Sequence, residues 1–217
     1  ITIPDSVTSI GYTPFQYCYS LTSIIVDSKN TIYHSASNCL IETSTKTLIA
    51  GCKNSVIPTD GSVTTIISGA FRDCSGLTDI TIPESVTTIG GWAFAYCIDL
   101  ASITIPDNVT LIGEYAFFDC SRLIIYCEVA SQPKRWNNNW NMMDNANCPV
   151  VWDCINNDKD ENGYAYIVEN GIRYSLKDGV ATVISQPQTI KGDIVIADNI
   201  NYKDTQFIVT SIDSGAF

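Results

Sequence analysis

Positive charge is scarce in this chain. Of its 217 residues, 12 are Lys or Arg and 23 are Asp or Glu, which gives a formal net charge of −11 at pH 7. Binding to nucleic acid needs clustered Lys and Arg that neutralise phosphates, and docking to anionic lipid needs basic clusters as well. The composition therefore argues against both kinds of partner and leaves basic or neutral partners open.

Long apolar runs and catalytic motifs are also missing. No apolar run approaches the ~20 residues that a membrane helix needs. There is no Gly-x-Ser-x-Gly, no glycine-rich phosphate loop and no zinc-hydrolase helix. A Cys–His nucleophilic pair would have to use the single histidine, His34, and no motif surrounds it. We therefore expect no enzyme activity, no cofactor and no membrane insertion.

What the chain does contain is a repeat. The segment Leu77–Gly90 reads Leu-Thr-Asp-Ile-Thr-Ile-Pro-Glu-Ser-Val-Thr-Thr-Ile-Gly, and Leu100–Gly113 repeats this pattern 23 residues later. Both continue with Ala-Phe-x-x-Cys, which also ends the preceding copy at residues 70–74. An earlier copy occupies residues 1–26 and a partial one residues 206–217. Self-similarity at a fixed period is the signature of stacked repeat architectures.

The pattern of one unit predicts its shape. Leu-x-x-Ile-x-Ile alternates and predicts a strand, which the proline ends because it cannot donate to a ladder. Val-Thr-x-Ile predicts a second short strand, Gly a sharp bend, and Ala-Phe-x-x-Cys a single helical or 3₁₀ turn. One such coil cannot bury a core alone, so stacked coils should share one. Two inner columns are expected, one of Phe71, Phe94 and Phe117 and one of Cys74, Cys97 and Cys120.

The 23-residue unit resembles the repeat of BspA-like leucine-rich-repeat proteins, over residues 1–26 and 56–126 and in part over 206–217. The resemblance implies a β-rich α/β solenoid, wound as a right-handed leucine-rich-repeat superhelix. It also implies a secreted or cell-surface protein that binds protein ligands, including host extracellular-matrix or plasma proteins such as fibronectin and fibrinogen.

Departures from the repeat predict how the first domain is organised. Residues 1–153 form the array, with an insertion at about 27–55 and a terminal cap at about 124–153, where the pattern decays. The insertion contains Leu40–Ile49, two apolar flanks around a polar tip, which predicts a β-hairpin projecting from the stack.

Residues 154–217 are predicted to form a second, β-rich unit. The dipeptides Asn170-Gly171 and Asp178-Gly179 are hairpin signals between apolar runs, so we expect an antiparallel leader that runs into a second repeat array. The chain begins and ends inside copies of the repeat. Both ends are interpreted as processing boundaries, so missing targeting signals carry no information.

The nine cysteines form an odd set. Those at the shared repeat position, Cys18, Cys74, Cys97 and Cys120, are interpreted as small buried hydrophobic residues. No Cys-x-x-Cys pair is present, so a structural zinc site is not predicted. A disulfide in an oxidising compartment stays open among the remaining cysteines: Cys39, Cys52, Cys127, Cys148 and Cys154.

An acidic segment has the spacing of a calcium loop. Asp158, Asp160 and Asn162 alternate before Gly163, and Glu169 follows. The flanks predict strands instead of the helices of an EF-hand. A solvated polar linker is therefore favoured, no metal site is predicted, and calcium binding by these residues stays open.

Two surfaces are candidates for ligand binding. Hydroxyl-rich side chains should face solvent between the core positions of the longer strand: Thr78, Asp79, Thr81, Ser102 and Thr104. The alternative is Trp136 and Trp140, which lie among asparagines, because exposed rings with amide neighbours suit a sugar or a peptide. Both rings could instead close the end of the core.

Taken together, the sequence predicts an extracellular recognition or adhesion module without catalysis. Two alternatives remain: a purely structural spacer in a larger surface protein, and a docking module attached to an enzyme. A charged or bulky side chain at Thr81 or Thr104 should weaken binding by an adhesion module and should not affect a spacer.

Overall fold

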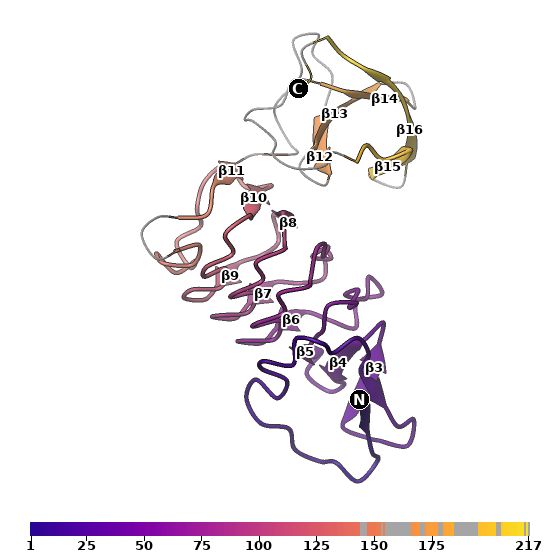
Figure 1. The fold of residues 1–217 in the computed structure, drawn as a ribbon, viewed down its shortest axis with the longest axis vertical. Coiled ribbons are helices and arrows are strands. Elements are labelled where there is room, and N and C mark those ends of the chain that lie inside the picture. Colours follow the sequence, from indigo (N-terminus) through magenta and orange to yellow (C-terminus); the bar gives the residue numbers. More distant parts are fainter. Residues whose placement is uncertain are drawn as a thin grey trace.

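The structure is a computed structural model that describes residues 1–143, 147–152, 154, 166–169, 172–177, 180–184, 195–202, 205–214 and 216. Within these residues it consists of strands and turns, with no helix. The repeats stack along the long axis of the molecule (Figure 1). The first repeat and the insertion lie at one end, and the C-terminal sheet lies at the other.

Like strands of successive repeats pair in parallel. The Val-Thr-x-Ile segments form the short strands β6 (Thr65–Ile66), β7 (Thr88–Ile89) and β9 (Leu111–Ile112). β6 pairs with β7, and β7 with β9, each time with equivalent repeat positions in register. The Val-Thr-x-Ile strands therefore form one continuous side of the stack.

The Leu-x-x-Ile-x-Ile segments form a second side. At the N-terminal end β1 (Thr2–Ile3) pairs in parallel with β2 (Ile25–Val26). Towards the cap β8 (Ser102–Ile105), β10 (Ile124–Cys127) and β11 (Val150–Trp152) form a parallel sheet with β10 in the middle. β11 takes the place of a further repeat, although its sequence has left the pattern.

The third side is built from the Ala-Phe-x-x-Cys segments, which form turns and not the predicted helical or 3₁₀ turn. The amides of Arg72 and Cys74 donate to carbonyls three residues earlier, whereas those of Phe71 and Asp73 donate to carbonyls of the following repeat. Asp73 has φ 62°, a left-handed value at which a right-handed helix cannot continue. The α/β part of the predicted fold class is therefore wrong for the described residues: these turns form a ladder between repeats.

One apolar core runs from the insertion through the array to the cap. Phe71, Phe94 and Phe117 are fully buried, and consecutive ring centroids lie 5.0 and 5.4 Å apart. Their planes differ by only 5° and 3°, so the rings stack as one column. The predicted phenylalanine column is confirmed, and with it the shared interior of the stacked repeats.

The insertion does not project from the stack. It forms β3 (Tyr33–Ala36), β4 (Cys39–Glu42) and β5 (Thr47–Ala50), an antiparallel meander whose last strand pairs in parallel with β6. Successive residues of β4 face two different cores: Ile41 lies in the main core, and Leu40 in a separate core with the first repeat. The predicted hairpin is present as β4–β5. It lies between the first repeat and the following repeats instead of projecting into solvent, because both of its faces are apolar.

The C-terminal sheet contains β12 (Tyr166–Glu169), β13 (Ile172–Lys177), β14 (Val180–Val183), β15 (Asn199–Tyr202) and β16 (Thr205–Ile212). Strands β12, β13 and β14 pair antiparallel in sequence order, as the two hairpin signals predict. β14 then pairs in parallel with β16, which also pairs antiparallel with β15. The sheet is thus mixed, and not the all-antiparallel meander that the sequence predicts.

Candidate functional site

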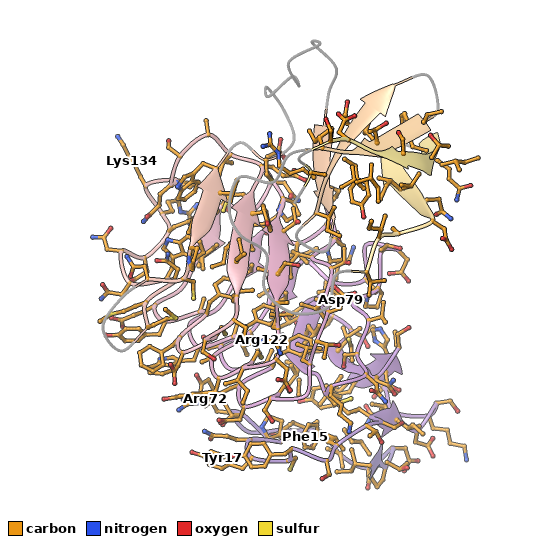
Figure 2. All side chains as sticks on the ribbon, turned by 45° about the horizontal axis from the view of Figure 1, so that its top comes forward. Phe15, Tyr17, Arg72, Asp79, Arg122 and Lys134 are labelled. Atoms are coloured by element: carbon orange, nitrogen blue, oxygen red, sulfur yellow. The ribbon has the colours of Figure 1, made fainter. Side chains whose placement is uncertain are left out.

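The predicted binding residues lie on the side of the array formed by the Leu-x-x-Ile-x-Ile segments. Their neighbours Leu77, Ile80 and Ile103 point into the core and are at most 5% exposed. The outward side chains in between are exposed in one repeat and half-buried in the next: Thr78, Asp79 and Thr81, then Ser102 and Thr104. We call these five residues the strand face, and Asp79 marks it in Figure 2. Alternation within β8 places Ser102 and Thr104 on its outer side, and Asp79 and Thr81 occupy the equivalent positions one repeat earlier. The five residues thus form an outer surface that consists mostly of hydroxyl groups.

The strand face has a defined end. Tyr126 of β10 pairs with Thr104 of β8 and points to the same side, but it is only 2% exposed. It packs with Cys154 and with Ile184, which follows β14. The C-terminal unit therefore covers the outer side of β10, and the open surface stops at β8.

The tryptophans proposed as an alternative binding site are buried. Trp136 is 2% exposed and Trp140 is 1% exposed. Their ring centroids lie 5.0 Å apart, and that of Trp140 lies 5.8 Å from Phe117, the last ring of the phenylalanine column. The Trp136 indole N–H donates to the Val109 carbonyl at 3.0 Å. Covered rings offer no face to a sugar or peptide, so this alternative is wrong: both rings close the end of the core.

The buried cysteines form a hydrogen-bonded column. The thiols of Cys97, Cys120 and Cys148 each donate to the carbonyl oxygen of the phenylalanine one repeat earlier, at 3.2, 3.0 and 3.5 Å. Cys148, which the sequence places outside the column, continues it into the cap. Cys18, predicted to be buried, is exposed, because the insertion separates the first repeat from the main core.

Burial makes these thiols poor nucleophiles. It raises the pKa of Cys97 well above its usual value, and raises the pKa of Cys120 to about 12 with a smaller contribution from Cys148. All nine cysteines are free thiols in the structure. Because the thiolate is the reactive species, the column supports packing and not covalent chemistry.

Acidic side chains meet at another corner of the repeats. Carboxylate oxygens of Glu84, Asp107 and Glu128 lie within 4.8 Å of one another, in a solvent-accessible position. Glu84 and Asp107 each follow the proline that ends a long segment, a signal that sequence reasoning missed. The calcium-loop candidates are not placed: Asp158, Asp160 and Asn162 lie outside the described residues, as does the side chain of Glu169.

The third side carries a cluster of aromatic rings that the sequence reasoning also missed. We call it the aromatic turn edge; it comprises Trp92, Tyr96, Tyr115 and Phe118, with Arg72 beside them. Each ring is half-buried, and neighbouring centroids lie 4.8 to 5.6 Å apart. The Arg72 guanidinium carbon lies 4.7 Å from the Trp92 ring centroid. Figure 2 shows Arg72 and Tyr17 along one edge of the molecule, away from Asp79.

The backbone holds several of these rings in an unusual conformation. Trp92, Tyr115 and Tyr96 have φ values of 59°, 56° and 62°. In the repeat, Trp92 and Tyr115 share a position with Gly69, whose φ is 71°. The sequence does show aromatic residues next to the Ala-Phe pairs, and these could have predicted the cluster. The repeat was recognised from its core positions, and the aromatic residues lie between those positions.

Comparison with known proteins identifies the repeat. The BspA-type leucine-rich-repeat region matches six copies over residues 1–124. A leucine-rich repeat protein from Eubacterium ventriosum is 31% identical, with a TM-score of 0.53 over 61% of this chain and 37% of its own. The pneumococcal vaccine antigen PcpA is 20% identical, with a TM-score of 0.51 over 70% of this chain and 42% of its own, which shows the fold alone.

These similarities cover part of larger molecules, since the chain spans about two fifths of the length of both structural relatives. No curated protein matches the chain. In the part of the chain that the structure describes, no helix has the length and hydrophobicity to cross a membrane. The match over more than half of the sequence means that the chain belongs to the BspA-type leucine-rich-repeat family, a family of protein-interaction repeats.

Proposed function

We propose that this chain is a recognition module of a secreted or cell-surface protein and that it binds protein ligands through the strand face. The family supports protein interaction as the general role. The observation that carries the proposal is the repeated outward placement of hydroxyl side chains, Thr81 in one repeat and Thr104 in the next, over a fully packed core.

The surface suits a protein better than a small molecule. A small-molecule site is a concave pocket that buries most of its ligand, whereas the strand face is the outer side of a stack of extended segments. Its only charged member is Asp79. Hydroxyl groups donate and accept hydrogen bonds, and they cost less to desolvate than charged groups do. A rigid scaffold also loses little entropy on binding.

The wider architecture and role form part of the same proposal. The array is a right-handed solenoid, and residues 154–217 lead into a second array. The whole protein is an adhesin that contacts host matrix or plasma proteins. The BspA-type family, to which the repeats belong, supports this extracellular role. A spacer role is the second candidate, and the elongated stack in Figure 1 favours it.

The test is a surface-binding titration with immobilised fibronectin and fibrinogen. Wild-type protein should bind at least one of them saturably, and Thr81→Arg with Thr104→Arg should weaken that binding by about tenfold or more, because a long cation then disrupts a matched interface. Thr110→Arg is the matched control, since Thr110 is exposed but lies outside the strand face.

The outcomes separate the two candidates. Saturable binding that survives the double substitution would rule out the strand face as the site. Absence of binding to every matrix and plasma protein tested, with a correctly folded chain, would favour the spacer. Circular dichroism and thermal unfolding establish that the variants are folded.

A further inference from the structure

The aromatic turn edge has a composition that the fold itself does not require. Trp92 and Tyr115 occupy the repeat position of Gly69, and Tyr96 occupies that of Asp119. All of these positions have left-handed φ values. A side chain with a β-carbon is strained in that region, and glycine, Asp or Asn is the residue usually found there. The strained aromatic residues therefore point to a role for the side chains themselves.

We propose that the aromatic turn edge binds an arginine-rich, extended segment of a partner protein, on a surface separate from the strand face. Trp, Tyr and Arg are the residue types that dominate binding energy in protein interfaces. Here they are contiguous, partly exposed and held by a backbone that is bonded to both neighbouring repeats.

The chain itself shows that guanidinium groups fit these rings. Arg72 lies 4.7 Å from the ring centroid of Trp92 and 5.7 Å from that of Tyr96. Such cation–π contacts are favourable, and they strengthen when a partner excludes water. At the position of Arg72 the next two repeats carry Ala95 and Phe118, so neither repeat supplies an arginine from this position to the rings of Tyr115 and Phe118.

Charge favours a basic partner. The exposed Glu114 and the half-buried Asp119 flank the rings of Tyr115 and Phe118 in sequence, and the whole chain carries −11. A second copy of the chain would repel this surface. A sugar is also a poorer fit: Phe118 meets its ring neighbours at 50° to 81°, so the rings form a corrugated surface and not a flat stacking platform.

The experiment uses the full chain and a synthetic peptide of alternating Arg and Pro, which stays extended. Binding is measured by isothermal titration calorimetry at about 0.15 M ionic strength, where exposed charges more than about 8 Å apart are largely screened. The substitutions Trp92→Gly and Tyr96→Asn should together weaken binding by about tenfold or more. The same substitutions relieve left-handed strain and also remove ring contacts to Tyr115 and Phe118, so circular dichroism and thermal unfolding establish that the variant is folded before its affinity is compared. Added salt should weaken wild-type binding, because exposed charges are screened.

The matched control removes charge elsewhere: Glu84→Gln, Asp107→Asn and Glu128→Gln together should leave peptide binding within about twofold. An equal loss in this triple variant would mean that net charge alone attracts the peptide, and would overturn the proposal. So would unchanged binding in the Trp92 and Tyr96 variant, or equal binding of a Gln–Pro peptide or of cellohexaose.

The strand-face hypothesis can fail independently. Thr81→Arg and Thr104→Arg should leave affinity for the Arg–Pro peptide within about twofold, because they lie on another side of the repeat. Loss of matrix-protein binding with retained peptide binding would support both surfaces. Loss of peptide binding in the strand-face variant would show that the two surfaces are one, which overturns the claim of a separate site.

Discussion

At the scale of single residues, the interior is organised by position in the repeat. Each phenylalanine of the column lies flat against the next, and its carbonyl accepts a thiol hydrogen from the following repeat. The same residue therefore serves two repeats, once through its ring and once through its backbone. A change at one such position affects contacts on both sides.

We expect Phe94→Ala to lower the free energy of unfolding by about 3–5 kcal/mol, because it opens a cavity between two stacked rings. Urea unfolding followed by circular dichroism measures this change. Ile98→Ala in the same repeat is the control: Ile98 is 44% exposed, and its truncation should cost about 0.5 kcal/mol or less. Equal effects of the two substitutions would contradict a tightly packed column.

The sequence predicts residues well where the repeat is regular and poorly where it stops. Phe71, Phe94 and Phe117 could be aligned because their spacing is constant. Cys148 could not be recognised as part of the thiol column, because the cap reaches that place along an irregular path in which its amide donates to the Asn141 carbonyl. The exposure of Cys18 depends on where the insertion lies, which no local pattern specifies.

At the scale of elements, adjacent repeats approach so closely at the bends after β7 and β9 that a β-carbon does not fit there. Gly113 follows β9, and a β-carbon added there would lie 2.3 Å from the Gly91 nitrogen of the preceding repeat. Gly90 faces Ser68 at the same distance. Both obstacles are backbone atoms, which cannot rotate away as a side chain does. The bend after each short strand is therefore a point of contact between adjacent backbones.

Gly113→Ala should lower the free energy of unfolding by about 1–3 kcal/mol or more, because the repeats must separate to admit a methyl group. Gly11→Ala provides the control at the equivalent position of the first repeat, where an added β-carbon would meet nothing within 4 Å. Differential scanning calorimetry on both variants measures the contrast. A smaller loss of stability at Gly113 than at Gly11 would argue against the close approach.

The insertion shows why element type was easier to predict than element placement. Leu40 and Ile41 are adjacent and both fully buried, so β4 is covered on each face. Two consecutive apolar residues at each end of the hairpin were visible in the sequence and are typical of a doubly covered strand. The local sequence does not say which parts of the chain cover each face of β4, because this depends on tertiary contacts with the main core on one side and the first repeat on the other.

At the scale of the whole molecule, the buried thiols couple folding to alkaline pH. Burial raises the pKa of six cysteines above the ordinary value of 9.0: Cys39, Cys74, Cys97, Cys120, Cys127 and Cys148. Above pH 9.0 the unfolded chain releases these protons while the folded chain retains them. Stability is therefore complete below about pH 9 and falls as the pH rises towards the folded-state values.

Each such thiol contributes a slope of up to about 1.4 kcal/mol per pH unit in that range. Cys120→Ala should reduce the wild-type slope by up to that amount, in urea titrations at successive pH values between about 8 and 11. Val109→Ala, a buried substitution without a titrating group, should lower stability and leave the slope unchanged. An unaltered slope in the Cys120 variant would mean that this thiol ionises equally in both states.

The molecule as a whole could be predicted as far as the repeats extend. The shared interior follows from the period alone, whereas the parallel pairing of β14 with β16 and the burial of Tyr126 against Ile184 involve segments with no common pattern. The aromatic turn edge was missed for a different reason. The repeat is recognised from its core positions, and the aromatic residues of this edge lie between those positions, on the surface.

The backbone hydrogen bonds between repeats, which run through the strands and through the turns, have a mechanical consequence. Pulled along the stacking direction, a repeat loses its neighbour only when bonds on several sides of the coil break together. Rupture should then proceed from an end, one repeat at a time, and each 23-residue repeat should release about 76–83 Å of extended chain. Such a chain lengthens in steps under load, and the repeats that have not yet ruptured stay folded.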